Sequence, residues 1–225
     1  RGYDKSTGVG LRLGYQGRLS DSVTIGAAYA PKMSMGEFDN YKGLFAESGD
    51  FDIPSSLVAG FAVTPDDRWT LAFDYERIWY SDANSVHNRS SLILNCFGGD
   101  ASACLGGSNG AGFGWQDVDV WKVGVQYRLN DRWTLRGGYN HTDNPIEAQD
   151  VTLNILAPGV MKSHWTLGAT WKIDAKSELT SAFMYAPREE VTGQSLFAQL
   201  GAPPTTTDTI GMRQYELGVA YQRRF

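Results

Sequence analysis

The residues that could carry out chemistry are few and scattered in this chain. The three histidines, His87, His141 and His164, are widely separated, and none belongs to an HExxH or other paired-ligand motif. The sequence also contains neither a P-loop nor a GxGxxG motif. The acidic pairs Glu189–Glu190 and Asp66–Asp67 fall in expected loops or turns, where a solvated charge is the simplest interpretation. We therefore expect no enzyme, no metal site and no cofactor.

The only cysteines, Cys96 and Cys104, lie close together in the stretch NCFGGDASACLGG. Such a pair could be a disulfide, half of a metal site or two free thiols. No CxxC spacing is present and only His87 is near, which argues against zinc. We favour a disulfide, which would imply an oxidising compartment.

The composition limits the classes of partner. The chain has 225 residues, with 20 Lys and Arg against 25 Asp and Glu, which gives a formal charge of −5. This balance argues against a nucleic-acid partner, because such proteins usually present a basic face. No apolar run approaches the ~18–20 residues of a membrane-spanning helix. A spanning β-strand, however, needs only ~9–11 residues of alternating character.

The phrase DRWTL occurs twice, at 67–71 and at 131–135. Beyond it, apolar and polar residues alternate strictly: Trp69, Leu71, Phe73 and Tyr75 are interleaved with Thr70, Ala72, Asp74 and Glu76. A period of two is typical of a strand with one apolar and one polar face. In both copies we expect Asp and Arg to form a short turn that precedes the strand.

The same alternation recurs along the chain and predicts about nine strands, the first over about 7–18. The others are expected near 23–30, 57–63, 69–76, 121–129, 133–140, 165–173, 179–185 and 215–225. Tight turns at 19–22, 64–68, 129–132 and 173–177 alternate with long loops at about 33–50, 83–114, 144–159 and 188–211. Short turns at one end and long loops at the other are typical of an up-and-down antiparallel barrel.

The direction of the apolar face decides between a membrane barrel and a soluble β-sandwich or lipocalin-like barrel. Long strands, a polar opposite face and two groups of aromatic rings all favour lipid. The rings are Tyr15, Trp69, Tyr127 and Trp133 near the short turns, and Tyr29, Trp79, Trp121, Trp165 and Tyr185 near the long loops. We therefore predict an all-β, transmembrane antiparallel up-and-down β-barrel in a bacterial outer membrane. Leu71, Leu135 and Leu217 should then face lipid.

The polar face should line the lumen of this barrel. Its charged residues are Arg12, Lys32, Asp74, Glu76, Lys122, Arg136 and Glu216. They could bind a ligand, but we favour pairing with one another and with a plug. With the short turns on the periplasmic side, the first and last strands both run inward, whereas bacterial barrels usually have an even number of strands. We expect residues 1–225 to be the C-terminal part of a single barrel domain that lacks an odd number of strands upstream.

The stretch GWQDVDVWKVGVQYRLNDRWTLRGGYNHTDNPIEAQ (114–149) resembles the late strands of the FadL/TodX family of outer-membrane transporters for hydrophobic compounds. The shared features are the turn and strand at 131–136, the Asp-Asn-Pro-Ile element at 143–146, and Ala148-Gln149. SHWTLGATWKID and the terminal ELGVAYQRRF match the next and the final strand. The resemblance places 1–225 on the C-terminal nine strands of a fourteen-stranded barrel, with the N-terminal plug and the first strands absent.

The resemblance implies passive uptake of fatty acids or aromatic hydrocarbons by a Gram-negative bacterium. Substrate would be captured in an outer groove, passed to an interior site and released sideways into the membrane. The implied partners are this substrate, outer-membrane lipid, lipopolysaccharide and the missing part of the same barrel, and the implied state is a monomer. The loop at 33–50 matches the groove, with Met33, Tyr41, Leu44 and Phe45 as candidate ligand contacts.

Gln116 stands where fatty-acid members are expected to have a basic residue, which favours neutral hydrocarbons over carboxylates. The alternative function is a general polar-solute porin or a purely structural outer-membrane barrel.

Overall fold

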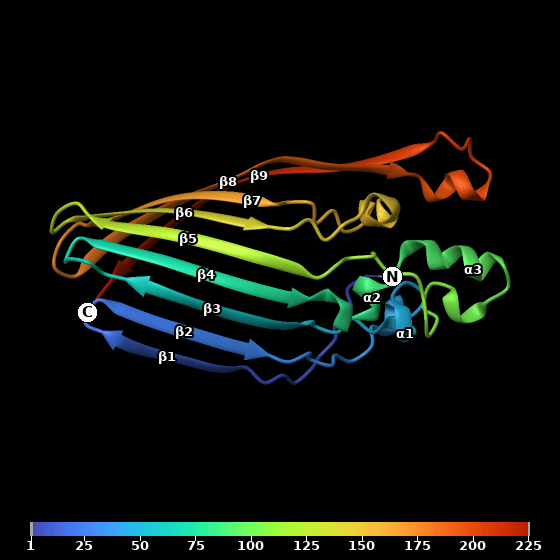
Figure 1. Ribbon diagram of the computed structural model, residues 1–225, viewed down its shortest axis with the longest axis horizontal. Coiled ribbons are helices and arrows are strands. Elements are labelled where there is room, and N and C mark those ends of the chain that lie inside the picture. Colours follow the sequence, from blue (N-terminus) through green and yellow to red (C-terminus); the bar gives the residue numbers. More distant parts are fainter. Residues whose placement is uncertain (1, 225) are drawn as a thin grey trace.

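The computed structural model describes residues 2–224, in which one antiparallel sheet of nine strands follows the order of the sequence (Figure 1). The strands are β1 (Leu13–Ser20), β2 (Val23–Ala30), β3 (Ser55–Val63), β4 (Trp69–Trp79), β5 (Val118–Arg128), β6 (Trp133–Thr142), β7 (Ser163–Lys172), β8 (Ser177–Gln194) and β9 (Thr207–Arg223). The predicted all-β, up-and-down arrangement is confirmed.

Two predicted boundaries are wrong. The first strand begins at Leu13 rather than near residue 7, because its partner β2 ends at Ala30 before Pro31, which has no N–H to donate. Half of the loop expected at 188–211 is strand, and only 195–206 lie between β8 and β9. A register shift between Ala186 and Glu189 interrupts the alternation beside Pro187, and the ladder resumes beyond it.

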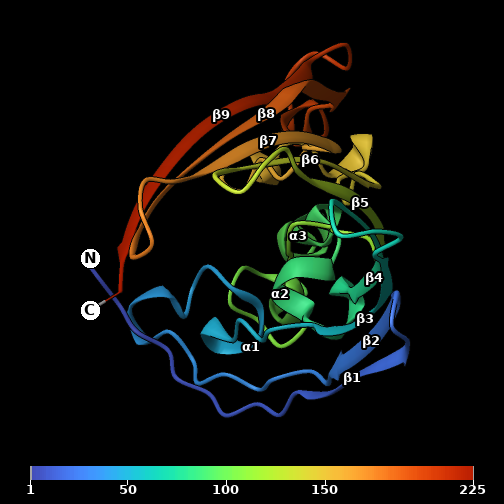
Figure 2. The same ribbon diagram turned by 90° about the vertical axis from the view of Figure 1, so that its left-hand side faces the viewer.

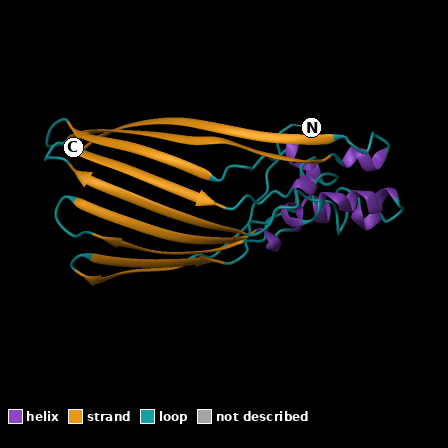
Figure 3. Ribbon diagram, turned by 45° about the horizontal axis from the view of Figure 1, so that its top comes forward, coloured by secondary structure: helices purple, strands orange, loops and turns teal. Residues whose placement is uncertain are grey.

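The sheet curls around an interior space. Met212 and Gln214 of β9 line the same cavity as Glu76 and Ile78 of β4, although the two strands are five positions apart in the sheet. Figure 2 shows the sheet as an open arc, with α1 (Ala46–Gly49), α2 (Asn84–His87) and α3 (Ile93–Phe97) on its concave side. The long loops and helices gather at one end of the strands and the tight turns at the other (Figure 3). No helix among residues 2–224 is long and apolar enough to cross a membrane.

The apolar rows point away from the interior. Leu71, Leu135 and Leu217 are 47%, 40% and 73% exposed, whereas Val118 and Val120, on the opposite face, are buried at 3% and 8%. The inner face carries the polar positions of the alternation, in agreement with the predicted directions of the two faces.

Aromatic rings pair across neighbouring strands near both ends of the sheet. Near the tight turns, Trp69 lies 4.4 Å from Tyr127 between ring centroids. Near the long loops, Tyr139 lies 4.4 Å from Trp165. Cross-strand ring pairs stabilise a sheet, and amphipathic rings favour the two membrane interfaces.

Both copies of the repeated phrase follow an Asp or Asn whose side-chain oxygen accepts two backbone hydrogen bonds. Asp66 Oδ1 accepts hydrogen bonds from the N–H groups two and three residues later, at 2.7 and 2.9 Å. Asn130 Oδ1 does the same at 2.9 and 2.9 Å, and Asp174 Oδ1 at 2.8 and 2.9 Å. These hydrogen bonds direct the chain into the next strand. The same Asx turn occurs at three of the tight turns.

Candidate binding site

A cavity of about 580 Å³ lies between the inner face of the sheet and the long loops. We call it the outer chamber. Its apolar lining consists of Ile78, Val118 and Val120 from the strands, Met212 from β9, and Trp115, Pro145, Pro158 and Met161 from the loops. Its polar lining includes Glu76, Lys122, Asn140, His164 and Gln214. The chamber therefore combines an apolar lining with a few polar groups, which is typical of small-molecule sites.

A second cavity of about 390 Å³, the inner chamber, lies against the inner face beside the first. The two adjoin, because Lys122, Asn140 and His164 line both. Its wall is thin where Gly124 and Gly138 face each other across β5 and β6. Glycine at these positions leaves the interior free of side chains.

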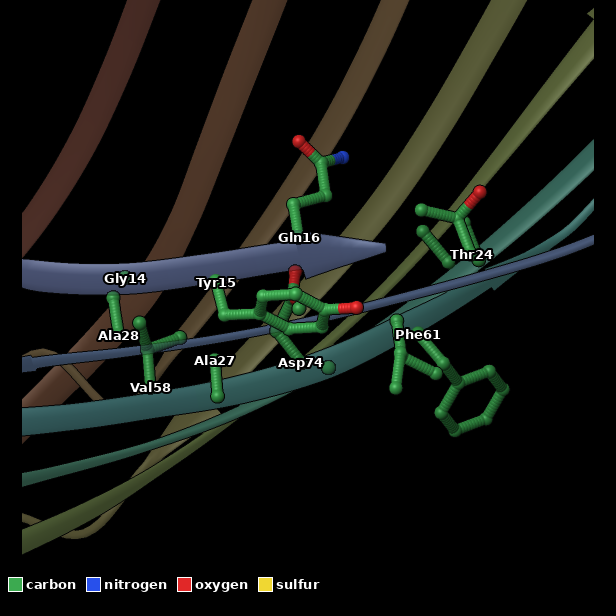
Figure 4. Close-up of a pocket in the computed structure, with 14 residues that line it drawn as sticks. Gly14, Tyr15, Gln16, Thr24, Ala27, Ala28, Val58, Phe61 and Asp74 are labelled. Atoms are coloured by element: carbon green, nitrogen blue, oxygen red, sulfur yellow. The ribbon is translucent and has the colours of Figure 1, made fainter. Parts of the chain in front are cut away.

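A third, open depression of about 440 Å³ continues along β1 to β4. Figure 4 shows that Gln16 and Phe61 project to opposite sides of this part of the sheet. Small residues make up much of its inner surface, among them Gly26, Gly60 and Ala62. The interior space therefore extends across several strands.

Four polar residues from adjacent strands form a continuous row across the inner face. Asp74 is the register partner of Lys122, Lys122 of Asn140, and Asn140 of His164. We call this set the polar row. Lys122, Asn140 and His164 of this row line both chambers, and Asp74 lines the inner one.

Trp115 is held against the outer chamber by a buried network of hydrogen bonds. Its Nε1 donates to Asn154 Oδ1 at 2.7 Å. The Nδ2 of Asn154 donates to the carbonyl oxygens of Phe113, at 2.6 Å, and Asp150, at 2.9 Å. Trp115 also packs against a small core of Ile146, Val151, Val160 and Ile210. The ring therefore has a fixed orientation.

The carboxylate of Asp150 links the loop between β6 and β7 to the loop between β4 and β5. It accepts hydrogen bonds from the N–H and Oγ of Ser90, both at 2.8 Å, and pairs with Arg89 at 2.7 Å. Arg89 also pairs with Glu147, and this hydrogen bond lowers the pKa of the Glu147 carboxyl. Gly114 has φ +70°, and a Cβ there would lie 2.2 Å from the Asp150 carboxylate carbon. Only glycine suits that position, which directly precedes Trp115.

The charged residues expected in the lumen differ from one another in their contacts. Lys122 Nζ pairs with Glu76 Oε2 at 2.7 Å. Arg136 donates to Gln126 at 2.9 Å and to Thr170 at 2.7 Å. Asp74 and Glu216 occupy inner-face positions of β4 and β9, and Arg12 directly precedes β1.

Lys32 lies beyond the end of β2, where Pro31 stops the strand, so its place in the lumen stays a prediction. Lys32 pairs there with Asp52 at 2.6 Å. Hydrogen bonding to Asp52 raises the pKa of Lys32.

The same loop contains a second, unusual carboxyl. Burial, followed by the proximity of Asp52, raises the pKa of Asp50 to about 6. Burial alone would also raise the pKa of Asp52, but hydrogen bonds from Lys32 and the Met35 N–H outweigh it and lower that pKa.

The four loop residues expected to bind ligand lie outside the two chambers. Phe45 belongs to an aromatic cluster with Phe38 and Phe51, at centroid distances of 6.0 and 5.0 Å. Met33 forms an isolated bridge with Ile53. The Tyr41 hydroxyl donates to the Gly2 carbonyl oxygen at 2.8 Å, and Leu44 follows in the same loop. Their role in binding stays a prediction.

Gln116 donates from Nε2 to the carbonyl oxygen of Gly114 at 2.8 Å, and its neighbour Trp115 is the residue that lines the outer chamber. The role of Gln116 also stays a prediction.

The remaining reactive side chains have structural surroundings. Cys96 and Cys104 form a disulfide with a Cα–Cα distance of 4.7 Å. No group of three or more potential ligands within residues 2–224 could hold a metal ion. The stretch GGSNG at 106–110 has the GxSxG spacing, but Ser108 lies in an exposed turn rather than between a strand and a helix.

Sequence reasoning also missed Trp115, Asn140 and His164 as parts of one site. Asn140 and His164 fall on the predicted polar face, so their inward direction was readable. Their adjacency was not, because it depends on the register between β6 and β7. The position of Trp115 depends on contacts between loops about 60 residues apart, such as the pair Arg89 and Asp150.

A curved, antiparallel sheet with apolar residues outside and chambers inside is typical of outer-membrane β-barrel proteins. Residues 3–225 match the family model of the outer membrane protein transport proteins (OMPP1/FadL/TodX), and the chain belongs to this family. Its location is therefore the outer membrane. The family consists of transport proteins, which agrees with the prediction that the chain is not an enzyme.

Solved structures share the fold at low sequence identity. The Pseudomonas putida toluene transporter TodX is 22% identical with a TM-score of 0.63, over 98% of this chain and 50% of that chain. The CymD monoaromatic hydrocarbon channel is 18% identical with a TM-score of 0.57, over 97% and 51%. A Pseudomonas aeruginosa FadL homologue is 15% identical with a TM-score of 0.59, over 94% and 50%. The chain thus spans about half the length of these proteins. Comparison with curated proteins gives no significant match.

Proposed function

We propose that this protein takes up uncharged hydrophobic small molecules across the outer membrane by passive diffusion through the outer and inner chambers. The observation that carries the proposal is the lining of the outer chamber, where Trp115, Val120 and Met212 provide an apolar wall on the inner side of a membrane barrel. Two proteins of the same fold are described as a toluene transporter and a monoaromatic hydrocarbon channel, which supports this substrate class.

Such transport needs no energy source. An apolar molecule crosses the polar lipopolysaccharide layer poorly, and an apolar-lined path removes that barrier. The charges along the path favour uncharged cargo. The two chambers are lined by the carboxylates of Asp74, Glu76 and Asp143 and the cations of Lys122 and Arg136. Because the lining has no excess of positive charge, a fatty-acid carboxylate would gain little there.

The remaining steps extend this proposal. Capture would begin at the loop of Met33, Tyr41, Leu44 and Phe45, near Gln116, and release would occur sideways into lipid. The sheet is proposed to be the C-terminal part of a single barrel domain that further strands complete. The unpaired sides of β1 and β9 support this, since an open edge within lipid leaves backbone groups without partners.

A general polar-solute porin is the second candidate, favoured by Gln126 and Arg136 in the inner chamber. Swelling of liposomes that contain the intact protein distinguishes the two. Rapid swelling with sugars would identify a porin, and sugar exclusion with hydrocarbon uptake would identify the transporter.

The proposed path can be blocked at Gly124. A Cβ there would meet only the Gly137 carbonyl oxygen, at 4.0 Å, so a large side chain has room to enter the inner chamber. We expect Gly124→Trp to reduce uptake of labelled propylbenzene by about tenfold or more, in cells that lack other transporters of this class.

Gly218→Trp is the matched control. It is also an inner-face strand glycine, with nothing within 4 Å of an added Cβ, but it lies outside both chambers. It should transport at the wild-type rate. Equal uptake by Gly124→Trp and wild type, with both variants folded, would refute passage through the inner chamber.

A further inference from the structure

We propose that the polar row recognises a hydroxyl group, so that the preferred cargo is an uncharged apolar molecule with one hydroxyl, such as an alkylphenol. This inference rests on the proposed function and specifies its substrate class. It begins with two polar atoms that have no partner.

Asn140 Oδ1 and His164 Nδ1 are buried and make no hydrogen bond with any residue in 2–224. The two residues face each other on β6 and β7, and both line the outer and the inner chamber. Directly opposed Cβ atoms in an antiparallel pair lie about 4.5–5.5 Å apart. A single small group can therefore contact both side chains.

Two neighbouring polar side chains are already engaged. Lys122 Nζ pairs with Glu76 at 2.7 Å. Gln214 Nε2 contacts Met212 Sδ at 3.0 Å. Burial of an unpaired polar atom is unfavourable. A ligand that forms hydrogen bonds with these two atoms removes this cost, and its binding free energy becomes more favourable.

A hydroxyl group has the chemistry that this pair requires. It donates one hydrogen bond, which Asn140 Oδ1 accepts, and it accepts one from His164 Nδ1–H. The amide of Asn140 could also be oriented with its NH2 group toward the hydroxyl, with His164 in the other tautomer. Asn140 would then donate and His164 Nδ1 would accept, so the pair would still offer one donor and one acceptor. Both atoms are buried in the empty site, so binding requires rotation about χ2 of Asn140 and His164, a torsion with a broad energy well.

Other end groups suit the site less well. A hydrocarbon leaves both polar atoms unpaired. A carboxylate cannot donate, and it would lie near Asp74 and Glu76, whose negative charges oppose it and balance those of Lys122 and Arg136. The apolar body of the ligand would extend from the polar row toward Trp115 and Met212.

The test compares three ligands with the same body: propylbenzene, 4-propylphenol and 4-propylbenzoate. Binding to the intact, detergent-purified protein is measured by calorimetry, and uptake is measured in cells. We expect the phenol to bind about tenfold more tightly than the hydrocarbon, and the benzoate to bind most weakly.

His164→Phe and, separately, Asn140→Leu should bring the ratio of phenol to hydrocarbon affinity to about one. His141→Phe is the matched control. His141 lies on the same strand as Asn140 but faces outward, where it is exposed and contacts Ser163 at 3.1 Å. This variant should keep the wild-type ratio.

Two results would overturn the inference: equal affinity of the wild type for phenol and hydrocarbon, or a preference that survives both chamber substitutions in folded protein. In either case, binding and uptake of propylbenzene would leave the proposed function intact. Failure to bind or take up any of the three ligands would instead refute the proposed function.

Discussion

Asp50 lies in the loop between β2 and β3, outside the spanning strands, and its pKa is raised. Its Oδ1 is buried without a hydrogen-bond partner in the described part of the chain, and burial raises its pKa to about 6. The charged groups that face it are Asp52, Glu47 and Lys32, of which only Lys32 is positive. The loop between β2 and β3 therefore holds a proton that an unfolded loop would release near pH 3.8.

The sign of the pH effect follows from this difference. The stabilisation from protonated Asp50 is complete below its unfolded pKa and is lost as the pH rises through about 6. We expect hydrogen exchange in loop 31–54, corrected for intrinsic rates, to show stronger protection at about pH 4.5 than at about pH 7.5. In Asp50→Asn, the loop should be as strongly protected at about pH 7.5 as at about pH 4.5, because the amide stays neutral.

Asp39→Asn is the control for this substitution. Asp39 belongs to the same loop but is largely exposed and pairs with Lys42 at 2.9 Å, so its replacement should leave the pH dependence in place. Protection that does not change with pH in the wild type would contradict the assignment to Asp50.

At the scale of the elements, the tight turns show why a short phrase is repeated. The Asx oxygen accepts two backbone N–H groups, and the strand that follows begins with a ring at the membrane interface. We expect Asn130→Ala to lower the free energy of unfolding by about 1 kcal/mol, because two turn N–H groups lose their acceptor. Urea titration of the protein in detergent measures this change.

Asp131→Ala is the comparison for the turn. Asp131 is the next residue of the same turn, yet its side chain makes no hydrogen bond within residues 2–224. Its replacement should change the free energy of unfolding by less than about 0.5 kcal/mol. Equal losses for the two variants would show that the Asx bonds are not the source of the stability.

The elements also mark the limit of inference from sequence. Alternation of apolar and polar residues was enough to locate nine strands and their apolar faces, because each strand has one polar and one apolar side. The extensions of β8 and β9 were missed because Pro187 and the shift beside it break the alternation. The start of β1 was misjudged because the alternation at Val9 and Leu11 continues where the ladder to β2 does not.

The candidate site was predictable only in part, for a related reason. The inner-face charges Glu76 and Lys122 could be assigned from alternation alone. Trp115 could not, because the hydrogen bond to Asn154 joins loops separated by 39 residues. Contacts between irregular segments leave no periodic signal in the sequence.

For the molecule as a whole, the curvature of the sheet creates two different apolar environments. The convex face has a depression of about 680 Å³ lined by Leu71, Phe73, Val123 and Leu167, among others. The concave face has the outer chamber, which adds Lys122, Asn140 and His164 of the polar row to its apolar wall. A hydrocarbon on the convex face would mix with lipid chains, whereas one in the chamber would be on a path through the barrel.

The position of a bound heavy atom therefore tests transport through the interior most directly. Crystals of the intact protein soaked with 4-bromotoluene would reveal the bromine by its anomalous scattering. The account predicts a bromine site in the outer chamber, within contact of Trp115, Val120 or Met212. Bromine found only on the convex face, beside Leu71 and Leu167, would contradict it.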